Sequence, residues 1–497
     1  MPVLKVSNQT KNNFSIKLIF PCRLKSSYSL SNFTPPLGMS SLASFLRHYG
    51  HYVEQEDFNM RMNLHNNGNA DIGRFKIEEA LQILKTGNFK CRLGFFVDRL
   101  VDSLSLGTKF KLIGFSNLAS DGFYFSLLLA RRIKQKTNTP LVFGGSFITL
   151  FGHLYPGILD YVDYMITGDG GEPLLKLIAY LNNEIPVSEV PNLIYKENAQ
   201  LKINPKKCYP LEGVFPPDYT GLPVDLYRVP QYGNNMRVYY QLSRGCSGKC
   251  SFCSFRGGRE KLEFKSYDKI LRELKQLKEK NNSNSFIFCD NAINISNDFL
   301  EGLCNLFIKN NLDISWLANA RVDNFDRHIL NKMKQAGCRA LSFGIESGSD
   351  RILKMMNKES SFSEASQVLK EVFDAGIKNE ISLICGFPQE RQEDIKQTIE
   401  FVRENGRFIS VIRRHIFFLY YGSDIYSNPA NYGIENLTPM PGYPHVFQYD
   451  ETAGLKWKQK WKQQNNSKKQ LRRICAFSRV SFAFNALKEG FYLSSKR

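Results

Sequence analysis

The chain of 497 residues contains no long apolar run. None of its hydrophobic stretches approaches the ~18 residues that cross a bilayer, and the first residues lack the hydrophobic region of a signal peptide. Cysteine is too sparse for a disulfide framework, with 11 residues spread along the chain. These absences exclude a membrane-inserted protein and a small disulfide-stapled domain. We therefore expect a cytoplasmic protein with two or three domains.

Acidic residues are in the minority, since 47 Asp and Glu oppose 66 Lys and Arg, which leaves a net charge of +19. Residues 455–497 carry twelve of these bases against one acid, Glu489. One interpretation is a surface for nucleic acid or an acidic peptide. The other, which we favour, is a solvated helical face with an aromatic packing stripe. The aromatic residues in question are Trp457, Trp461, Phe477, Phe482, Phe484 and Tyr492.

Three of the cysteines are clustered. Cys246, Cys250 and Cys253 form a C-x3-C-x2-C pattern, and no fourth cysteine follows nearby. Three thiolates on one loop can bind three irons of a 4Fe-4S cube and leave the fourth iron open, whereas structural zinc sites usually pair two C-x2-C halves. The alternative is that these residues are small hydrophobic core side chains.

The position of the cysteines supports the cluster. The stretch 237–242 alternates as a strand and leads directly into the cysteine loop, and a helix with Ile270, Leu274 and Leu277 on one face follows. Loops at the C-terminal ends of barrel strands are where such folds place their chemistry.

The cysteine spacing, with Phe252 before Cys253, resembles that of the radical S-adenosylmethionine (SAM) superfamily. The resemblance implies that SAM chelates the open iron and that one electron, from a donor such as flavodoxin or ferredoxin, cleaves it to a 5′-deoxyadenosyl radical. It also implies a partial (β/α)6 barrel. Six strand candidates fit that count, beginning near Arg237, Ser285, Asp313, Ala340, Glu380 and Ile409.

Further segments extend the resemblance and imply contacts to SAM. Glu346 and Ser347 lie in Gly-Ile-Glu-Ser-Gly after the fourth strand, and Gly386 opens a Gly-Phe-Pro segment expected near the adenine. Arg321 is a candidate for the SAM carboxylate. Asp290 stands where many members carry a Gly-Gly-Glu that binds the amino group, and its position alone assigns it that contact.

The first ~200 residues alternate strands and helices, as in a parallel sheet. Their glycine-rich turns resemble those of the cobalamin-binding domain of one radical SAM class. The resemblance implies a crevice lined by Gly38, Gly144, Gly145, Gly168 and Glu172. A doubly wound domain without the cofactor is the alternative. The Asp-x-His-x-x-Gly signature is absent, so a cobalt without a lower histidine is expected if cobalamin binds.

The predicted architecture is α/β: a Rossmann-like, cobalamin-binding-type parallel-sheet domain followed by a partial (β/α)6 radical SAM barrel of the TIM type and a small basic C-terminal region. The domain boundaries are predicted as 1–203, a Pro-rich linker at 204–232, the barrel at 233–430 and the C-terminal region at 431–497.

Three functions remain open on the sequence. The first is a cobalamin-dependent radical SAM C-methyltransferase acting on an unactivated carbon. The second is a radical SAM peptide epimerase in which the Cys385 thiol donates a hydrogen atom, although Cys385 also fits a buried core position. The third is an RNA-binding Fe-S protein, for which we find no RNA-binding module. We therefore expect a small-molecule or peptide substrate rather than nucleic acid.

Overall fold

The computed structural model describes residues 14–22, 34–65, 75–106, 109–229, 235–255 and 261–477. The chain forms two compact units, Met1–Leu226 and Tyr227–Arg497. The division between them falls within the Pro-rich segment 204–232. Phe482, Phe484 and Tyr492 of the basic tail lie outside the described residues.

The N-terminal unit is built on one sheet in the order β2-β1-β3-β4-β5-β6-β7. The first five strands of that order are parallel, and β6 and β7 form an antiparallel hairpin. The connection direction reverses between β1 and β3, which is where open α/β sheets bind ligands. The strands are β1 (Ser15–Phe20), β2 (Tyr52–Asp57), β3 (Leu112–Ser116), β4 (Leu141–Gly144), β5 (Tyr164–Ile166), β6 (Leu193–Glu197) and β7 (Gln200–Ile203).

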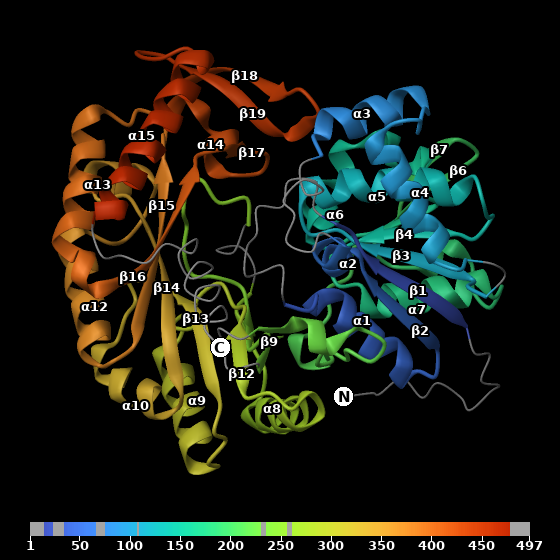
Figure 1. Ribbon diagram of the computed structural model, residues 1–497, viewed down its shortest axis with the longest axis horizontal. Coiled ribbons are helices and arrows are strands. Elements are labelled where there is room, and N and C mark those ends of the chain that lie inside the picture. The colour runs from blue at the N-terminus through green and yellow to red at the C-terminus, as the bar shows by residue number, and fades with distance from the viewer. Residues whose placement is uncertain are drawn as a thin grey trace, which may run out of the picture. The chain divides into compact units, whose positions relative to one another are not determined.

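Helices cover both faces of this sheet (Figure 1), with α1 and α7 on one face and α3, α4 and α5 on the other. The central parallel strands are buried between two helical layers and form short apolar runs, as in β3, where Leu112–Phe115 is buried. The sequence analysis did not predict α3, α4 or the β6-β7 hairpin. The helices are α1 (Leu37–His48), α2 (Phe58–His65), α3 (Ile77–Thr86), α4 (Arg92–Ser103), α5 (Ser120–Lys134), α6 (Ser146–Phe151) and α7 (Gly171–Leu181).

The C-terminal unit contains six parallel strands in the order β16-β15-β14-β13-β12-β9, and β8 (Arg228–Val229) pairs antiparallel with β9. Side chains alternate along these strands, with one set buried against helices and the other half-buried on the inner side, as in β15. The predicted six-stranded barrel is confirmed. The strands are β9 (Asn235–Tyr240), β12 (Ser285–Phe288), β13 (Ser315–Ala320), β14 (Cys338–Glu346), β15 (Lys378–Cys385) and β16 (Ile409–Ile416).

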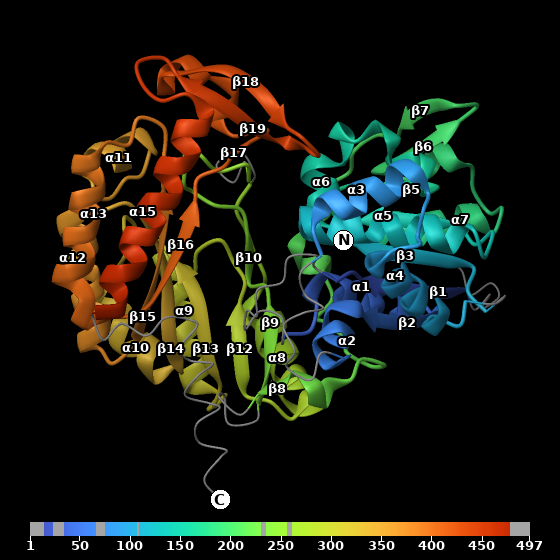
Figure 2. The same ribbon diagram turned by 45° about the horizontal axis from the view of Figure 1, so that its top comes forward.

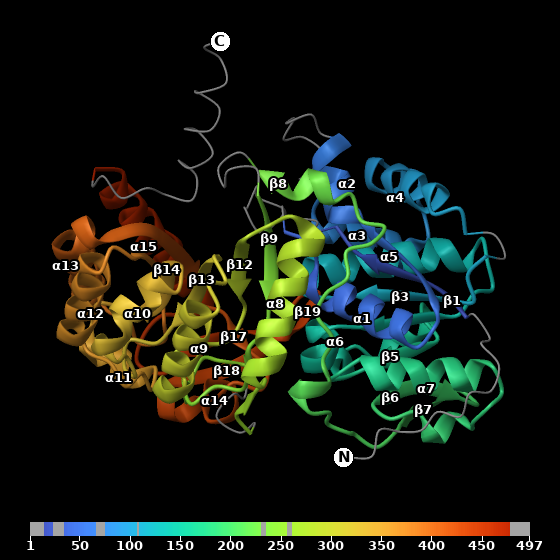
Figure 3. The same cartoon turned by 90° about the horizontal axis from the view of Figure 1, so that it is seen from below.

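The helices of this unit lie outside the strands (Figure 3). Several begin at serine caps: the Ser266 hydroxyl accepts from the Lys269 amide, and Ser361 forms a capping box with Glu364. These caps satisfy backbone donors that a helix start leaves unpaired. The helices are α8 (Tyr267–Asn281), α9 (Asn297–Lys309), α10 (Leu330–Gln335), α11 (Asp350–Met355), α12 (Phe362–Asp374) and α13 (Gln392–Asn405).

The chain after β16 adds a small sheet and a long helix. Strands β17 (Leu419–Tyr420), β19 (Tyr443–Glu451) and β18 (Ile434–Met440) form an antiparallel sheet, and α14 (Asp424–Ser427) lies between β17 and β18 in the chain. Helix α15 (Trp457–Phe477) then packs against β15, β16, β19 and α13 (Figure 2). The basic C-terminal region is therefore part of the barrel unit as far as residue 477.

Candidate active site

The three clustered cysteines lie on the loop that follows β9 and the short strand β10 (Ser243–Arg244). All three are free thiols of intermediate burial. Burial raises the pKa of Cys253 to about 11, and the nearby Cys250 and Cys246 thiols contribute in the same direction, so the three sulfurs lie within electrostatic range of one another. Gly245 begins the loop with φ +99°, a conformation that glycine adopts without strain.

Among the described residues, no three His, Cys, Asp or Glu side chains converge on the position of a single metal ion. A 4Fe-4S cube does not require such convergence, because each cysteine thiolate is a ligand of a cluster of several irons rather than of one ion. Three thiols spaced along one partly buried loop therefore fit a cluster better than a mononuclear zinc site.

Hydrogen bonds fix the cysteine loop to neighbouring elements. The Ser251 amide donates to the Met356 carbonyl at 2.9 Å, and the Ile425 amide donates to the Ser251 carbonyl at 3.1 Å. The Asn291 side chain donates to the Gly245 carbonyl at 2.9 Å. Segments that follow β12, β14 and β16 thus hold the loop, which gives the thiols defined positions before any cofactor binds.

Asp290 lies directly behind the start of this loop. Its carboxylate accepts hydrogen bonds from the Leu242 amide at 3.0 Å, the Ser243 hydroxyl at 2.7 Å and the Ser243 amide. Burial raises the pKa of Asp290 to about 6, although these donors act in the opposite direction. The structure therefore gives Asp290 a partner other than the predicted SAM amino group, namely the backbone that leads into the cysteines.

Glu346 ends β14 and lies close to the cysteines. It has φ +67°, and the pairing of β14 with β15 shifts register between Gly344 and Glu346. Such an irregularity re-aims a side chain at the end of a strand. Glu346 is within electrostatic range of Cys250 and Cys253, and burial raises its pKa while Lys358 lowers it.

Ser347 follows Glu346 but turns away from the loop. Its hydroxyl lies 3.2 Å from the Thr398 hydroxyl and accepts from the Ser349 amide at 3.1 Å. Ser347 is buried in these contacts, so it connects the end of β14 to α13.

Arg321 follows β13 and covers the cysteine loop from the side. A Cβ added to Gly248 would collide with the Arg321 guanidinium, so only glycine allows this approach. The guanidinium pairs with the buried Asp323, and Glu359 lies 3.7 Å away. Its Nε is buried and has no hydrogen-bond partner within the described part of the chain. A buried donor without a partner beside the cysteines suits an anionic ligand such as a carboxylate.

The alternation of β15 places Cys385 on the helix-facing side. Asn379, at the start of the same series of buried residues, donates to the Leu369 carbonyl of α12 at 2.6 Å. Cys385 is 2% exposed and has Glu390, Lys468 and Arg414 as its charged neighbours. This side is opposite to the one that a hydrogen donor to a substrate inside the barrel would need.

Gly386 follows Cys385 with φ +81°. Its amide donates to the Glu390 carboxylate at 2.8 Å, and its carbonyl accepts from Gln464 of α15 at 3.0 Å. A Cβ on Gly386 would collide with the Gln464 side chain. One side of the Gly-Phe-Pro segment is thus covered by the C-terminal helix, which the sequence analysis did not anticipate.

The sequence analysis also missed the polar side chains on the inner side of the strands. Counting back from Glu346 in steps of two reaches Gly344 and Ser342, whose register partners on β15 are Ser382 and Glu380, and Ser382 pairs in turn with Arg413 of β16. Arg413 forms an ion pair with Glu380 and donates to the Ser342 hydroxyl at 3.2 Å. The period of two would have found these residues, because alternate residues of a strand share one face.

In the N-terminal unit, the predicted glycines gather at the carboxyl edge of the sheet. Gly144 ends β4 and Gly145 follows it, beside Asn117 just after β3, and the Gly144 carbonyl accepts from the Asn117 amide at 2.8 Å. Gly145 has φ +97°, and a Cβ there would lie 2.5 Å from the Asn117 carbonyl oxygen. Gly38, at the start of α1, lies at the same edge near the hydroxyl of Ser116, where an added Cβ would make only an ordinary contact at 3.9 Å.

Gly168 and Glu172 complete this edge. The Gly168 amide, after β5, donates to the Thr149 hydroxyl at 2.9 Å, and Glu172 occupies the first turn of α7. The Asn117 side-chain oxygen at this edge is buried and makes no hydrogen bond to any residue that the structure describes. Closely approaching backbones and a buried polar atom without a partner fit a ligand crevice at the switch point of the sheet.

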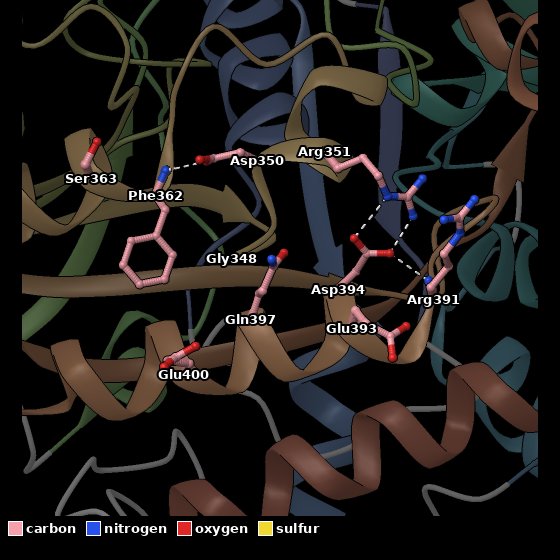
Figure 4. Close-up of a pocket in the computed structure, with 10 residues that line it drawn as sticks. All are labelled: Gly348, Asp350, Arg351, Phe362, Ser363, Arg391, Glu393, Asp394, Gln397 and Glu400. Atoms are coloured by element: carbon pink, nitrogen blue, oxygen red, sulfur yellow. Dashed lines mark hydrogen bonds and ion pairs between the residues drawn. The ribbon is translucent and has the colours of Figure 1, made fainter.

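An open groove of about 590 Å³ lies on the outside of the barrel unit, between α11, α12 and α13 (Figure 4). Its centre is Asp394, which accepts from Arg351, the Arg391 amide and the Ser349 hydroxyl. None of the cysteines or predicted SAM contacts lines it. The groove is a surface site centred on the Arg351–Asp394 ion pair rather than the active site.

Residues 240–402 match the Radical SAM superfamily. The C-terminal unit therefore carries a radical SAM domain. This domain contains the cysteine loop, Asp290, Arg321, Glu346 and Gly386, so the features described above belong to one catalytic fold. No helix in the described ranges is long and apolar enough to cross a membrane.

Curated relatives match a little over half of this chain. An uncharacterized methyltransferase from Pyrococcus horikoshii is 28% identical over 56% of this chain and 60% of its own length. An anaerobic magnesium-protoporphyrin IX monomethyl ester cyclase from Synechocystis is 23% identical over 53% of each chain. A putative methylthiotransferase from Methanocaldococcus jannaschii is 29% identical over 54% of this chain and 59% of its own. The matched stretch thus spans less than two thirds of these relatives.

Solved structures share the radical SAM domain's fold and that of the N-terminal unit. The radical SAM methyltransferase TsrM from Kitasatospora setae, with tryptophan and a SAM analogue bound, has a TM-score of 0.62 at 14% identity over 86% of this chain and 77% of its own. The cobalamin-dependent SAM radical enzyme OxsB, with aqua-cobalamin and SAM bound, has a TM-score of 0.66 at 15% identity over 92% of this chain and 66% of its own. The predicted fold class is confirmed.

Proposed function

We propose that the protein is a cobalamin-dependent radical SAM methyltransferase that acts on an unactivated carbon. The observation that carries the proposal is the combination of two sites in one chain. The radical SAM domain holds three thiols beside Arg321 and Glu346, and the N-terminal sheet has a glycine-lined edge at its switch point. OxsB and TsrM, which share this fold, bind cobalamin according to their structures.

In this proposal Cys246, Cys250 and Cys253 bind a 4Fe-4S cluster. Glu346 and Arg321 hold SAM beside it: Arg321 offers its free Nε to the SAM carboxylate, and Glu346 accepts from the ribose or the amino group. Phe252, between the second and third cysteines, packs against the apolar cluster that contains Ile352 and Met356. The Gly386 segment forms the side of the site that receives the adenine. Asp290 stabilises the cysteine loop instead of contacting SAM.

When bound, the cluster would supply the electron that cleaves SAM to a 5′-deoxyadenosyl radical, and cobalamin would carry the methyl group. The chain's own residues align the groups and exclude water. Gly38, Gly144, Gly145 and Gly168 let the backbone approach the corrin ring closely, and Asn117 offers its buried oxygen to a donor on the cofactor. Ser342, Ser382 and the pair Arg413–Glu380 line the inner side of the barrel and would orient a polar substrate.

We further propose that the protein works in the cytoplasm, where a flavodoxin or ferredoxin can deliver the electron. The substrate would be a small molecule or a peptide. The helix-facing position of Cys385 gives no support to the epimerase alternative.

The test begins with anaerobic purification and reconstitution with iron, sulfide and cobalamin, followed by desalting and a visible spectrum. The proposal expects corrinoid near one per chain together with cluster absorbance and 5′-deoxyadenosine formed from SAM. A cluster and 5′-deoxyadenosine without corrinoid would contradict the cobalamin part alone. No cluster and no 5′-deoxyadenosine would overturn the whole proposal.

A further inference from the structure

The loop between β15 and α13, residues Gly386–Glu390, is held along its length by side chains from elsewhere in the unit. We call it the β15 loop. The Phe387 carbonyl accepts from Lys460 at 2.8 Å, and the Gly386 carbonyl accepts from Gln464 at 3.0 Å. The Glu390 carbonyl accepts from Gln463 at 3.2 Å. Three side chains of α15 thus bind three carbonyls of one five-residue loop.

Two further side chains fix the centre of the β15 loop. The Gln389 amide donates to Glu451 of β19 at 2.8 Å, and the Gln389 carbonyl accepts from Arg351 of α11 at 2.7 Å. Gln389 has φ +62°, which is unusual for a residue other than glycine. A strained conformation persists only where its surroundings over-determine it, and here both polar backbone groups of Gln389 have outside partners.

The inward face of α15 is largely polar, and Leu471 continues it as a buried apolar residue. Lys460, Gln464 and Ser467 follow one another at helical spacing and are buried, with Lys460 and Gln464 at 0% exposure. Lys460 forms an ion pair with Glu451 at 2.8 Å. A buried lysine is costly unless it is paired, so this face is specific for the carbonyls and carboxylates that it meets.

We propose that α15 is a brace for the SAM site, in which Lys460 and Gln464 are positioning residues that set the β15 loop through its carbonyls. The inference rests on the proposed function, because it takes the Gly386 segment to be the side of the site that receives the adenine of SAM. It assigns a role to a helix that lies entirely outside the segment 240–402 matched by the superfamily. A loop shifted by a fraction of an ångström would meet the adenine poorly while leaving the cysteines in place.

The lead variant is Gln464→Leu, which removes the donor to Gly386 without changing any charge. Its matched control is Gln470→Leu, on the exposed side of the same helix. Lys460→Met is the stronger variant and is paired with Lys462→Met, also exposed. Anaerobic titration with SAM gives the Kd for SAM, and iron analysis and thermal unfolding report the cluster and the fold.

We expect Gln464→Leu to weaken SAM binding roughly tenfold, and Lys460→Met to weaken it more, with unchanged iron content and with both controls like wild type. A Gln464→Leu protein with a lower Tm but a wild-type Kd for SAM at a temperature where it stays folded would overturn the inference. Loss of iron from Gln464→Leu would do the same. Failure of the wild-type protein to cleave SAM would instead overturn the proposed function, so the two failures are distinguishable.

Discussion

The Asp290 carboxylate accepts a hydrogen bond of 2.7 Å from the Ser243 hydroxyl, three residues before the first cysteine of the loop. It also accepts from the Leu242 and Ser243 amides, so one buried acid satisfies three donors at the point where the chain leaves the barrel strand. Behind it, Lys265 and Glu273 form a second buried pair at 3.0 Å. Buried polar side chains within the barrel thus support the start of the cysteine loop.

Replacing Asp290 with Ala should therefore affect the cluster through the loop. The change leaves buried amide donors without partners, at a cost of about 1–3 kcal/mol each. We expect a lower Tm and less iron per chain after reconstitution. Asp290→Asn should be milder, since its carbonyl oxygen can still accept from Ser243. Asp374→Ala, at an exposed position, is the control. Wild-type iron content in Asp290→Ala, combined with weaker SAM binding, would favour a direct SAM contact instead.

Single Ala substitutions at Cys246, Cys250 and Cys253 should each abolish 5′-deoxyadenosine formation, because a cluster missing one of three thiolates is not held in an active form. Iron and sulfide analysis and the visible spectrum measure the cluster directly. Cys208→Ala, which removes an exposed thiol from the N-terminal unit, should leave all three readouts unchanged. SAM cleavage retained without these thiols would contradict the central assignment.

Cys385→Ala should keep both SAM cleavage and turnover. The side chain lies on the helix-facing side of β15 and fills core space, so we expect only a loss of about 1 kcal/mol in unfolding free energy. Unfolding in denaturant measures the change in stability. Assays of 5′-deoxyadenosine and of product measure SAM cleavage and turnover. A variant that still cleaves SAM but forms no product would identify Cys385 as the hydrogen donor after all.

Stability should depend on pH near neutrality through Glu390. Burial raises the pKa of Glu390 to about 7, opposed by Lys460 and the Gly386 amide and reinforced by Asp394 and Glu451. The folded state therefore binds a proton that the unfolded state has released, and stability falls as pH rises from the ordinary pKa of a glutamate through about 7. Cys385 and Tyr449 are the other titratable groups that face this carboxyl.

The measurement is the difference in unfolding free energy between wild type and Glu390→Gln from pH 6 to pH 8. Glutamine mimics the protonated acid and can still accept from the Gly386 amide, so the variant should gain stability relative to wild type as pH rises. A difference that is independent of pH would show that the Glu390 carboxyl does not titrate in this range.

Gly145→Ala should disturb the carboxyl edge of the N-terminal sheet, where we propose that cobalamin binds. The backbone of Gly145, at φ +97° and ψ 176°, disfavours any side chain by roughly 1–3 kcal/mol, and the added Cβ would also press on the Asn117 carbonyl. We expect reduced corrinoid content and a lower Tm, with normal iron content. The control is Gly213→Ala, where an added Cβ meets nothing within 4 Å. Unchanged corrinoid content in Gly145→Ala would contradict a binding site at this edge.

Patterns that repeat over a few residues were sufficient for much of the fold. Apolar strands separated by amphipathic helices predicted the parallel sheet, and six strand starts matched the count of the barrel that the resemblance to the radical SAM superfamily implied. Helices α3 and α4 and the β6-β7 hairpin were not predicted. The other strands and helices of the N-terminal unit already form a regular alternation, so nothing in the pattern called for these additional elements. The cysteine loop was found because its ligands are close in sequence.

Side-chain roles were harder to predict, as three residues illustrate. Position alone suggested Asp290 as a SAM contact, whereas its donors come from the end of β9. At Cys385, which ends β15, a barrel-facing thiol and a buried core position both fitted the sequence, and the alternation of the strand places the side chain towards the helices. Lys460 belonged to a run of bases that favoured a solvated helical face, yet its side chain is fully buried.

The sequence by itself determined the three-thiol loop, the strand count and the glycine-rich turns, because each of these depends on residues that are near one another along the chain. Only the tertiary structure decided which charged side chains are buried and which groups they bind. Lys460 can be buried because it forms an ion pair with Glu451 and donates a hydrogen bond to the Phe387 carbonyl. Both contacts require β15, β19 and α15 to pack together. A buried charge is stable only with partners, and those partners are brought together by folding.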